Sequence, residues 1–136
     1  MYYHGRVVPG GRTPTGAKIP YIRKKRKREL GRPPAETVVG ELKVKRQRVR
    51  GGGIKLKLLS VDFANVAIPS EGRSVRAKIL RVIGNPANPD YNRRGVITRG
   101  AIIETEVGKA RVVSRPGQHG IVNAVLVEGA ESEKKR

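Results

Sequence analysis

The side chains that most often perform catalysis or bind metals are scarce in this sequence. It has two histidines, His4 and His119, and no cysteine, and neither histidine has a second ligand at a metal-binding spacing. Glu104 and Glu106 are two residues apart, which would place both on one face of a strand, but acid–base catalysis also needs a cleft and a substrate. We expect these carboxylates to balance cations such as Arg111 across a hairpin. The sequence therefore predicts no catalytic site, metal or cofactor, and a protein that is not an enzyme.

The charge of the chain indicates binding instead. Its 136 residues include 30 Lys and Arg against 11 Asp and Glu, a formal net charge of +19. A small domain with this charge repels itself, so we expect a polyanionic partner: nucleic acid, an anionic membrane or an acidic protein. No apolar run approaches the ~18 residues of a membrane-spanning helix, and the first residues lack the apolar core of a signal peptide. We therefore expect a cytosolic protein that binds nucleic acid and no small-molecule substrate.

The positive charge is concentrated in the first part of the chain. Residues 1–36 hold 10 basic and 2 acidic residues (+8), and residues 37–58 hold 7 and 1 (+6), whereas residues 101–128 hold 3 of each. Residues 1–36 also contain five Gly and five Pro, and they have too few apolar residues to offset the entropy of ordering. We interpret them as an extended basic arm that becomes ordered on RNA.

The most basic part of this arm is the cation run 23–28, six consecutive Lys and Arg residues. Such a run can be a solvated tail, a nuclear-import signal or a phosphate-binding segment. The arm offers little else that could interact, so we favour phosphate binding, with the release of counterions from the nucleic acid.

From Thr37 onward the pattern is that of short β-strands, because apolar residues alternate with polar ones. The expected strands lie within residues 41–46, 54–58, 59–68, 74–83, 96–103, 105–111 and 121–127. A change of parity at Ile79–Leu80 suggests a bulge, and Gly108–Lys109 are expected at a hairpin turn. Residues 85–94 and 114–120 read as loops, and no helix is convincing. We predict an all-β fold, a six- to eight-stranded β-barrel over residues 37–128, with a polar C-terminal tail at 129–136.

Seven cations fall on two neighbouring predicted strands and the turn between them: Lys43, Lys45, Arg46, Arg48, Arg50, Lys55 and Lys57. Alternation would place Lys43 with Lys45, and Lys55 with Lys57, so pairing of the strands would create a basic stripe opposite the core. A face that only aids solubility normally mixes both signs of charge, and here only Glu41 does so. We therefore favour contact with RNA.

Five strings in this chain resemble the eight-e family of small-subunit ribosomal proteins from archaea and eukaryotes: RKKRKRELGRPPAET (23–37), VRGG (49–52), GNPANP (84–89), RGAIIETE (99–106) and SRPGQHGIVNAVL (114–126). The resemblance runs from about Gly5 to Val127, and the length suits the shorter archaeal form. It implies a β-barrel body with a basic N-terminal extension, bound to small-subunit rRNA. It also implies RNA contacts for the cation run 23–28 and for Gly31, Arg32, Arg48, Arg50, Arg115 and Gln118.

The predicted function is that of a structural constituent of the small ribosomal subunit that stabilises folded rRNA beside neighbouring ribosomal proteins. A ribosome-assembly factor and a DNA-packaging protein are the alternatives. The predicted RNA-binding residues are mainly cations, and they are Arg6, Arg12, Lys18, Arg23, Lys24, Lys25, Arg26, Lys27, Arg28, Gly31, Arg32, Lys43, Lys45, Arg46, Arg48, Arg50, Lys55, Lys57, Arg93, Arg94, Arg115 and Gln118.

Overall fold

The computed structural model describes residues 2–3, 11–19 and 30–127, and the chain divides into two compact units, Met1–Pro34 and Ala35–Arg136. In the first unit, β1 (Tyr2–Tyr3) pairs antiparallel with β2 (Leu30–Gly31). A turn brings Arg12 and Lys18 into an antiparallel bridge. Arg6, the cation run 23–28 and the tail 129–136 lie outside the described residues, so the predictions made for them are not tested by the structure.

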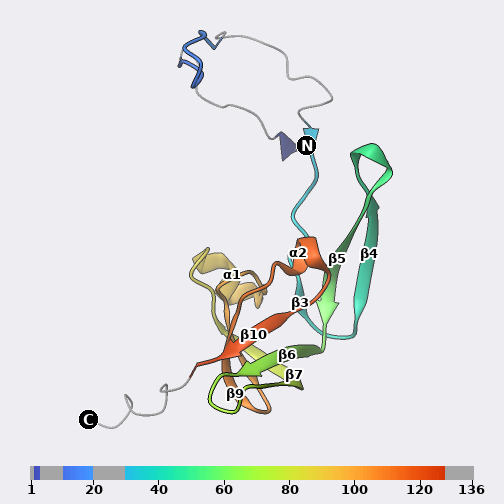
Figure 1. Cartoon of the computed structure of the whole chain (residues 1–136), viewed down its shortest axis with the longest axis vertical. Coiled ribbons are helices and arrows are strands. Elements are labelled where there is room, and N and C mark those ends of the chain that lie inside the picture. The colour runs from blue at the N-terminus through green and yellow to red at the C-terminus, as the bar shows by residue number, and fades with distance from the viewer. Residues whose placement is uncertain (1, 4–10, 20–29, 128–136) are drawn as a thin grey trace, which may run out of the picture. The chain divides into compact units, whose positions relative to one another are not determined.

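Residues 35–127 of the second unit, which are the part described, form eight strands and two short α-helices. The strands are β3 (Val38–Val39), β4 (Lys43–Arg48), β5 (Ile54–Val61), β6 (Phe63–Ile68), β7 (Arg73–Gly84), β8 (Ile102–Thr105), β9 (Gly108–Val112) and β10 (Asn123–Leu126). Five of them close a barrel in the order β10-β6-β7-β8-β9, and the other three form a sheet in the order β3-β5-β4 (Figure 1). The prediction of a small all-β barrel is confirmed, but the barrel itself has five strands rather than six to eight, because three of the eight strands form a separate sheet.

Strand β10 closes the barrel, because it pairs parallel with β6 and antiparallel with β9. Strand β7 is long enough to pair with β6 along its first half and with β8 along its second. Its register to β8 shifts between Ile79 and Arg81, which confirms the bulge predicted from the parity change. Such a bulge bends the strand and allows a narrow barrel to close.

The barrel core is made of small and β-branched side chains. Val66, Ala101, Ile103 and Ala110 are fully buried, and no aromatic residue belongs to the buried core of the described chain. Five strands enclose little volume, so residues of this size fill the interior. The low aromatic content of the sequence is therefore compatible with a well-packed barrel.

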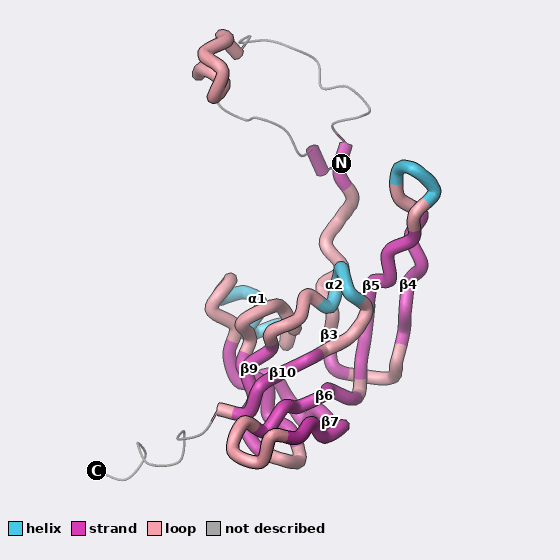
Figure 2. The backbone as a smooth tube through the Cα atoms, in the orientation of Figure 1, coloured by secondary structure: helices cyan, strands magenta, loops and turns pink. Residues whose placement is uncertain are grey.

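The second sheet leads away from the barrel. Strand β5 continues into β6 through Asp62, and its inner end pairs with β3. Beyond that end β5 pairs only with β4 within the described chain, and the two form a long hairpin that projects from the barrel (Figures 1 and 2). A short 3-10 turn, η2 (Arg50–Gly52), lies at the hairpin tip.

Two short helices occupy segments that we predicted as loops, α1 (Pro89–Arg94) and α2 (Pro116–His119). Each has proline in its first turn and ends at a glycine with positive φ, Gly95 or Gly120. Proline is tolerated in a first turn and glycine is favoured at the C-terminal cap. Both helices, of six and four residues, are too short to show the repeated apolar spacing by which a helix is identified in a sequence. The expectation of no helix in these two segments was therefore wrong.

The position of the β8–β9 turn also differs from the prediction. Thr105 and Gly108 are the last cross-strand pair, so Glu106 and Val107 form the turn rather than Gly108 and Lys109. Gly108 does have positive φ, 140°, but at the first position of the returning strand. Glycine at this position accommodates the positive φ that side chains other than glycine rarely adopt.

Candidate nucleic-acid interface

The hairpin β4–β5 sorts its side chains onto two faces of different chemistry. Residues directly opposite in an antiparallel pair point to the same side, and the register pairs Lys45 with Lys57 and Gln47 with Lys55. Lys43 is paired with Ser60 beyond a register shift, so alternation along β4 does not assign it to this face. We call this surface the lysine face, and it consists of Lys45, Gln47, Lys55 and Lys57.

The direct opposition of Lys45 and Lys57 is electrostatically unfavourable. Like charges opposite each other destabilise a strand pair, and no Asp or Glu occurs in β4, η2 or β5. Lys45 is exposed and Lys57 half-buried. A bound anion between the two ammonium groups would remove the repulsion, so this position suits a phosphate.

Arg46 and Arg48 lie on the opposite face of the hairpin. The register pairs Arg46 with Leu56 and Arg48 with Ile54. The predicted basic stripe therefore contains Lys45, Lys55 and Lys57 but neither arginine of β4. Arg50 is exposed in η2 at the tip, where Gly51 adopts positive φ.

Helix α2 places further polar residues next to the lysine face. The ammonium nitrogen of Lys55 donates to Oε1 of Gln118 at 2.9 Å, although the two residues are 63 positions apart. The His119 imidazole accepts the backbone N–H of Arg115 at its Nδ1 atom, so His119 stabilises the turn. Arg115 itself is exposed. Arg115, Gln118 and the lysine face thus form one polar surface built from distant parts of the sequence.

Contact between α2 and β5 depends on Gly120. A Cβ atom at this position would lie 2.6 Å from Cβ of Leu56, and the φ angle of Gly120 is +75°. Only glycine satisfies both the close approach and this backbone conformation. Gly120 therefore seats α2 beside the strand that carries Lys55 and Lys57.

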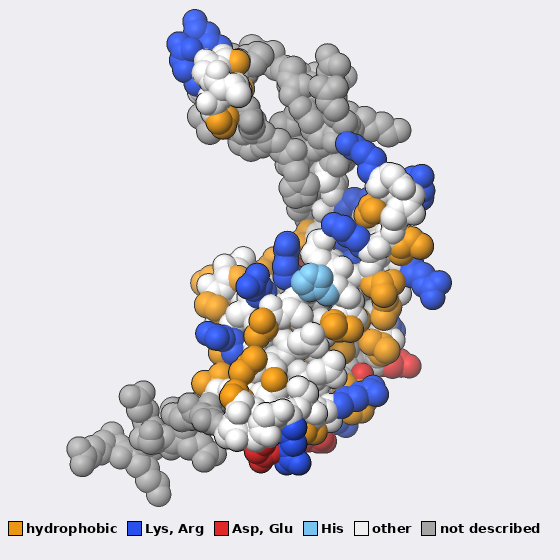
Figure 3. All heavy atoms as spheres, in the orientation of Figure 1, with side chains coloured by type: hydrophobic (Ala, Val, Ile, Leu, Met, Phe, Trp, Pro, Cys, Tyr) orange, Lys and Arg blue, Asp and Glu red, His pale blue; other side chains and the backbone are white. Residues whose placement is uncertain are grey.

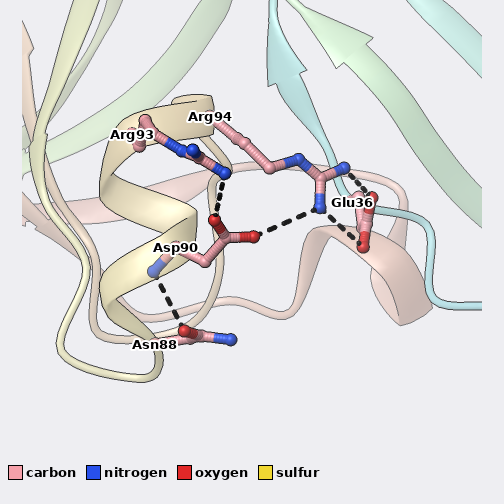
Figure 4. A network of polar contacts seen from close by, with 5 residues as sticks. All are labelled: Glu36, Asn88, Asp90, Arg93 and Arg94. Carbon is pink, nitrogen blue, oxygen red and sulfur yellow. Dashed lines mark hydrogen bonds and ion pairs between the residues drawn. The ribbon is translucent and has the colours of Figure 1, made fainter.

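Arg93 and Arg94 at the end of α1 are held by carboxylates (Figure 4). Arg93 binds Asp90 at 2.7 Å, and Arg94 forms an ion pair with Glu36 through both of its terminal nitrogens. The hydrogen bond and the charge of Glu36 raise the pKa of Arg94 above its ordinary value. The side chain of Asn88 caps α1 by accepting the N–H of Asp90. These two arginines are therefore partly neutralised, unlike the lysines of the hairpin.

The same contacts fix the first residues of the second unit. Glu36 has φ of +46°, the left-handed region that side chains other than glycine rarely adopt. The next residue, Thr37, is buried, and its hydroxyl donates to the carbonyl of Leu58 at 2.8 Å. Its own carbonyl accepts the N–H of Ile97. The backbone that follows the basic arm is thus bound to both β5 and the segment after α1.

Three arginines of β7 are balanced by neighbouring groups. Arg81 binds Glu104, Arg73 binds Glu71, and the guanidinium of Arg76 lies 4.4 Å from the centre of the Phe63 ring. The acidic side chains visible in Figure 3 lie at the barrel end of the unit, whereas Lys and Arg occur along the hairpin. The barrel therefore combines both signs of charge.

We expected Glu104 and Glu106 to balance cations such as Arg111 across the hairpin, but Arg111 faces neither glutamate. Glu104 binds Arg81 on β7, while the register places Lys109 opposite Glu104 and Ile102 opposite Arg111. Glu106 accepts the backbone N–H of Lys78. The error follows from the misplaced turn, which changes the residue that faces each glutamate.

In the first unit, Arg12 donates to the carbonyl of Gly16 at 2.9 Å and is bridged to Lys18. Gly31 belongs to β2, and Arg32 is exposed. The turn 13–17 is closed by a backbone hydrogen bond from Thr13 to Ala17. These residues hold a local loop shape within the arm, while their contact with RNA stays a prediction.

Sequence reasoning missed the long-range partners of this surface. Glu36 carried no local signal for its ion pair with Arg94, which lies 58 positions away, and Lys55 carried none for Gln118. The residues 2–3, 11–19 and 30–127 contain no group of three His, Cys, Asp or Glu that could hold a metal ion. No helix in this described part is long and apolar enough to cross a membrane.

Comparison with known proteins identifies relatives along nearly the whole chain. Residues 10–127 match the family described as Ribosomal protein S8e. A protein of Nanoarchaeum equitans named small ribosomal subunit protein eS8 is 50% identical over 126 residues, which cover 93% of this chain and 97% of that protein. Proteins with the same name from Pyrobaculum aerophilum and Methanocorpusculum labreanum are 49% and 47% identical, and they cover 93% and 94% of this chain and 96% and 100% of their own lengths.

Proposed function

This chain belongs to the ribosomal protein S8e family, and on that basis we propose that it is a structural protein of the small ribosomal subunit that binds folded small-subunit rRNA. The observation that carries the rRNA-binding part is the lysine face, where Lys45 stands opposite Lys57 without an acidic residue in either strand. The proposed partners are rRNA and neighbouring ribosomal proteins, and the proposed location is the ribosome.

The body would bind the phosphate backbone through the lysine face and the adjoining surface of α2. Lysine ammonium groups neutralise phosphates and release counterions. The amide of Gln118 and exposed backbone groups of the turn can contact ribose hydroxyls, which distinguish RNA from DNA. Recognition would therefore depend on RNA shape, since the chain has few aromatic side chains for stacking on bases.

The basic arm would add a net charge of +8, of the +19 of the whole chain. Residues 1–36 are proposed to follow the grooves between rRNA helices, with the cation run 23–28 neutralising closely packed phosphates. The contacts of Glu36 and Thr37 support this role, because they fix the point from which the arm starts. Fixing that point lowers the entropy that the arm loses on binding.

Salt dependence of rRNA binding tests the proposal. If arm and body together cover roughly ten phosphates, the slope of log K against log salt is expected to be about −7 to −9. Replacing two lysines, in K45Q/K57Q, is expected to reduce its magnitude by about 1.5. The matched control R73Q/R81Q also removes two cations, but both already bind carboxylates on the barrel. Equal slopes for the two variants, or a slope near zero for the unmodified chain, would contradict the proposal.

Duplex DNA serves as the competitor that separates this function from DNA packaging. We expect rRNA fragments to displace the protein from duplex DNA at equal phosphate concentration and equal salt. Continued presence of the protein in mature small subunits would separate a structural component from an assembly factor, which leaves before maturation.

A further inference from the structure

The face of the hairpin opposite the lysines has the composition of a protein-binding surface. We call it the arginine–aliphatic face, and it consists of Val44, Arg46, Arg48, Ile54 and Leu56. The three aliphatic side chains are 44%, 67% and 42% exposed for Val44, Ile54 and Leu56. Exposed aliphatic residues that gather on one face, rather than occurring singly, mark interaction sites.

This face is an extension of the barrel core. Val44 is paired with Leu58, which is 1% exposed and belongs to the core cluster. The next two pairs outward, Arg46–Leu56 and Arg48–Ile54, lie on the same side of the hairpin. Gly120 approaches Leu56 closely, but Leu56 and Ile54 remain 42% and 67% exposed. The apolar side of the sheet thus runs from a closed core onto an open surface.

Lysine and arginine are separated by face. Lys45, Lys55 and Lys57 lie on the lysine face together with a glutamine, and both arginines of β4 lie with the aliphatic residues, whereas Lys43 lies beyond the register shift at the start of β4. Arginine is enriched in protein–protein interfaces and lysine is depleted from them, because guanidinium is weakly hydrated and binds carboxylates in a bidentate manner. The two faces therefore suit two different kinds of partner.

We propose that the arginine–aliphatic face binds a protein whose contact surface combines aliphatic side chains with carboxylates. This inference rests on the proposed function, in which the lysine face is occupied by rRNA. RNA is the weaker candidate for the second face, since phosphates and riboses provide nothing that would cover Ile54 and Leu56. A second copy of this chain is also disfavoured, because it would bring Arg46 and Arg48 against the same cations.

Such an arrangement would place the hairpin between rRNA on one side and a protein on the other. Each partner would neutralise one set of cations, and the protein would also remove aliphatic surface from water. The hairpin would then be a bridging element of the ribonucleoprotein, with the barrel as its support.

The test compares two matched variants of the full chain, V44S/I54S and K45Q/K57Q. Binding is measured to small-subunit rRNA alone and to the same rRNA together with the total proteins of the small subunit. We expect V44S/I54S to bind rRNA alone within about twofold of the unmodified chain, and to bind the complete mixture about tenfold more weakly. Both replaced residues are exposed, and the unfolding midpoint of each variant is measured to verify folding.

A photo-crosslinking residue at position 54 or at position 45 gives a second readout in assembled subunits. We expect the crosslink from position 54 to join a protein at a site with aliphatic and acidic residues, and that from position 45 to join RNA. An equal loss of V44S/I54S binding with and without proteins, no loss in either mixture, or a crosslink from position 54 to RNA alone would overturn the inference. Failure of the proposed function would give a different result: K45Q/K57Q would bind rRNA with the same affinity as the unmodified chain.

Discussion

The barrel and the β4–β5 hairpin belong to the same unit but differ in how much of their surface is buried and in how their charges are paired. Each barrel strand buries one face, and its cations have partners such as Glu71, Glu104 and the Phe63 ring. Strand β4 has no buried residue, and β5 becomes buried only from Leu58 onward. The barrel is therefore stabilised by its own contacts, whereas the hairpin exposes most of its cations and aliphatic side chains to solvent. Under the proposed function, stability and binding would depend on separate strands.

The largest effect that tests this difference between barrel and hairpin is expected from a cavity in the barrel core. Ile103→Ala removes a fully buried side chain and should lower the free energy of unfolding by about 2–5 kcal/mol. The matched variant Ile54→Ala, on the hairpin, should lower it by less than about 0.5 kcal/mol, because the side chain is 67% exposed. Urea unfolding measures both. Similar losses in the two variants would mean that the hairpin is part of the stabilising core.

The next largest effect is expected where the two regions meet. Gly120→Ala would bring a methyl group against Leu56, in addition to the strain of positive φ, and should cost about 2–4 kcal/mol of folding free energy. Gly72→Ala is the control, since its φ is +64° but no atom lies within 4 Å of the added carbon. It should cost only about 1 kcal/mol. If the two variants unfold at the same urea concentration, the close approach of Gly120 to Leu56 does not contribute to the loss of stability.

A smaller effect is expected for a barrel cation. Arg76→Gln removes the contact with the Phe63 ring and should lower the free energy of unfolding by about 0.5–1 kcal/mol. The salt slope of rRNA binding should not change, because this cation serves the barrel. The variant Lys78→Gln, also on β7, controls for the loss of one charge. A shallower slope for Arg76→Gln alone would assign this residue to RNA.

The smallest expected change in stability has the opposite sign. Lys45→Glu places a carboxylate opposite Lys57 and should stabilise the hairpin by about 0.2–1 kcal/mol. The same substitution should make the salt slope of rRNA binding shallower by at least about 0.7. The control Lys45→Gln removes the repulsion without adding attraction. Its stability should lie between that of the unmodified chain and that of Lys45→Glu. A variant that gains stability without losing rRNA affinity would show that Lys45 is not at the RNA.

Short-range patterns in the sequence were sufficient for most of the strands and for the pairing of lysines in the hairpin. They missed β3 (Val38–Val39), and the strand expected within residues 96–103 begins only at Ile102. Alternation over residues 54–58 predicted β5, and the parity change at Ile79–Leu80 predicted the bulge of β7. These features depend on residues within a few positions of one another, where the two-residue period of a strand can be read directly. The pairing of the lysines then required only that the two strands be neighbours.

The remaining features depend on contacts that the sequence does not encode locally. Arg46 was placed in the basic stripe because we counted charge along the chain, whereas alternation moves it to the other face. The ion pair of Arg94 with Glu36 and the hydrogen bond of Lys55 to Gln118 join segments about 60 positions apart. The first contact requires α1 to lie beside the segment before β3, and the second requires α2 to lie beside β5.

Closure of the barrel by β10 has a consequence for the order of events during synthesis. Without residues 123–126, β6 and β9 would each keep an unpaired edge, and such edges invite pairing with other chains. A nascent chain emerges from its N-terminus, so the cationic half is exposed well before the strand that completes the body. Early capture of that half by RNA would hold the unfinished chain apart from its own copies, and the nucleic acid would then assist folding as well as being bound.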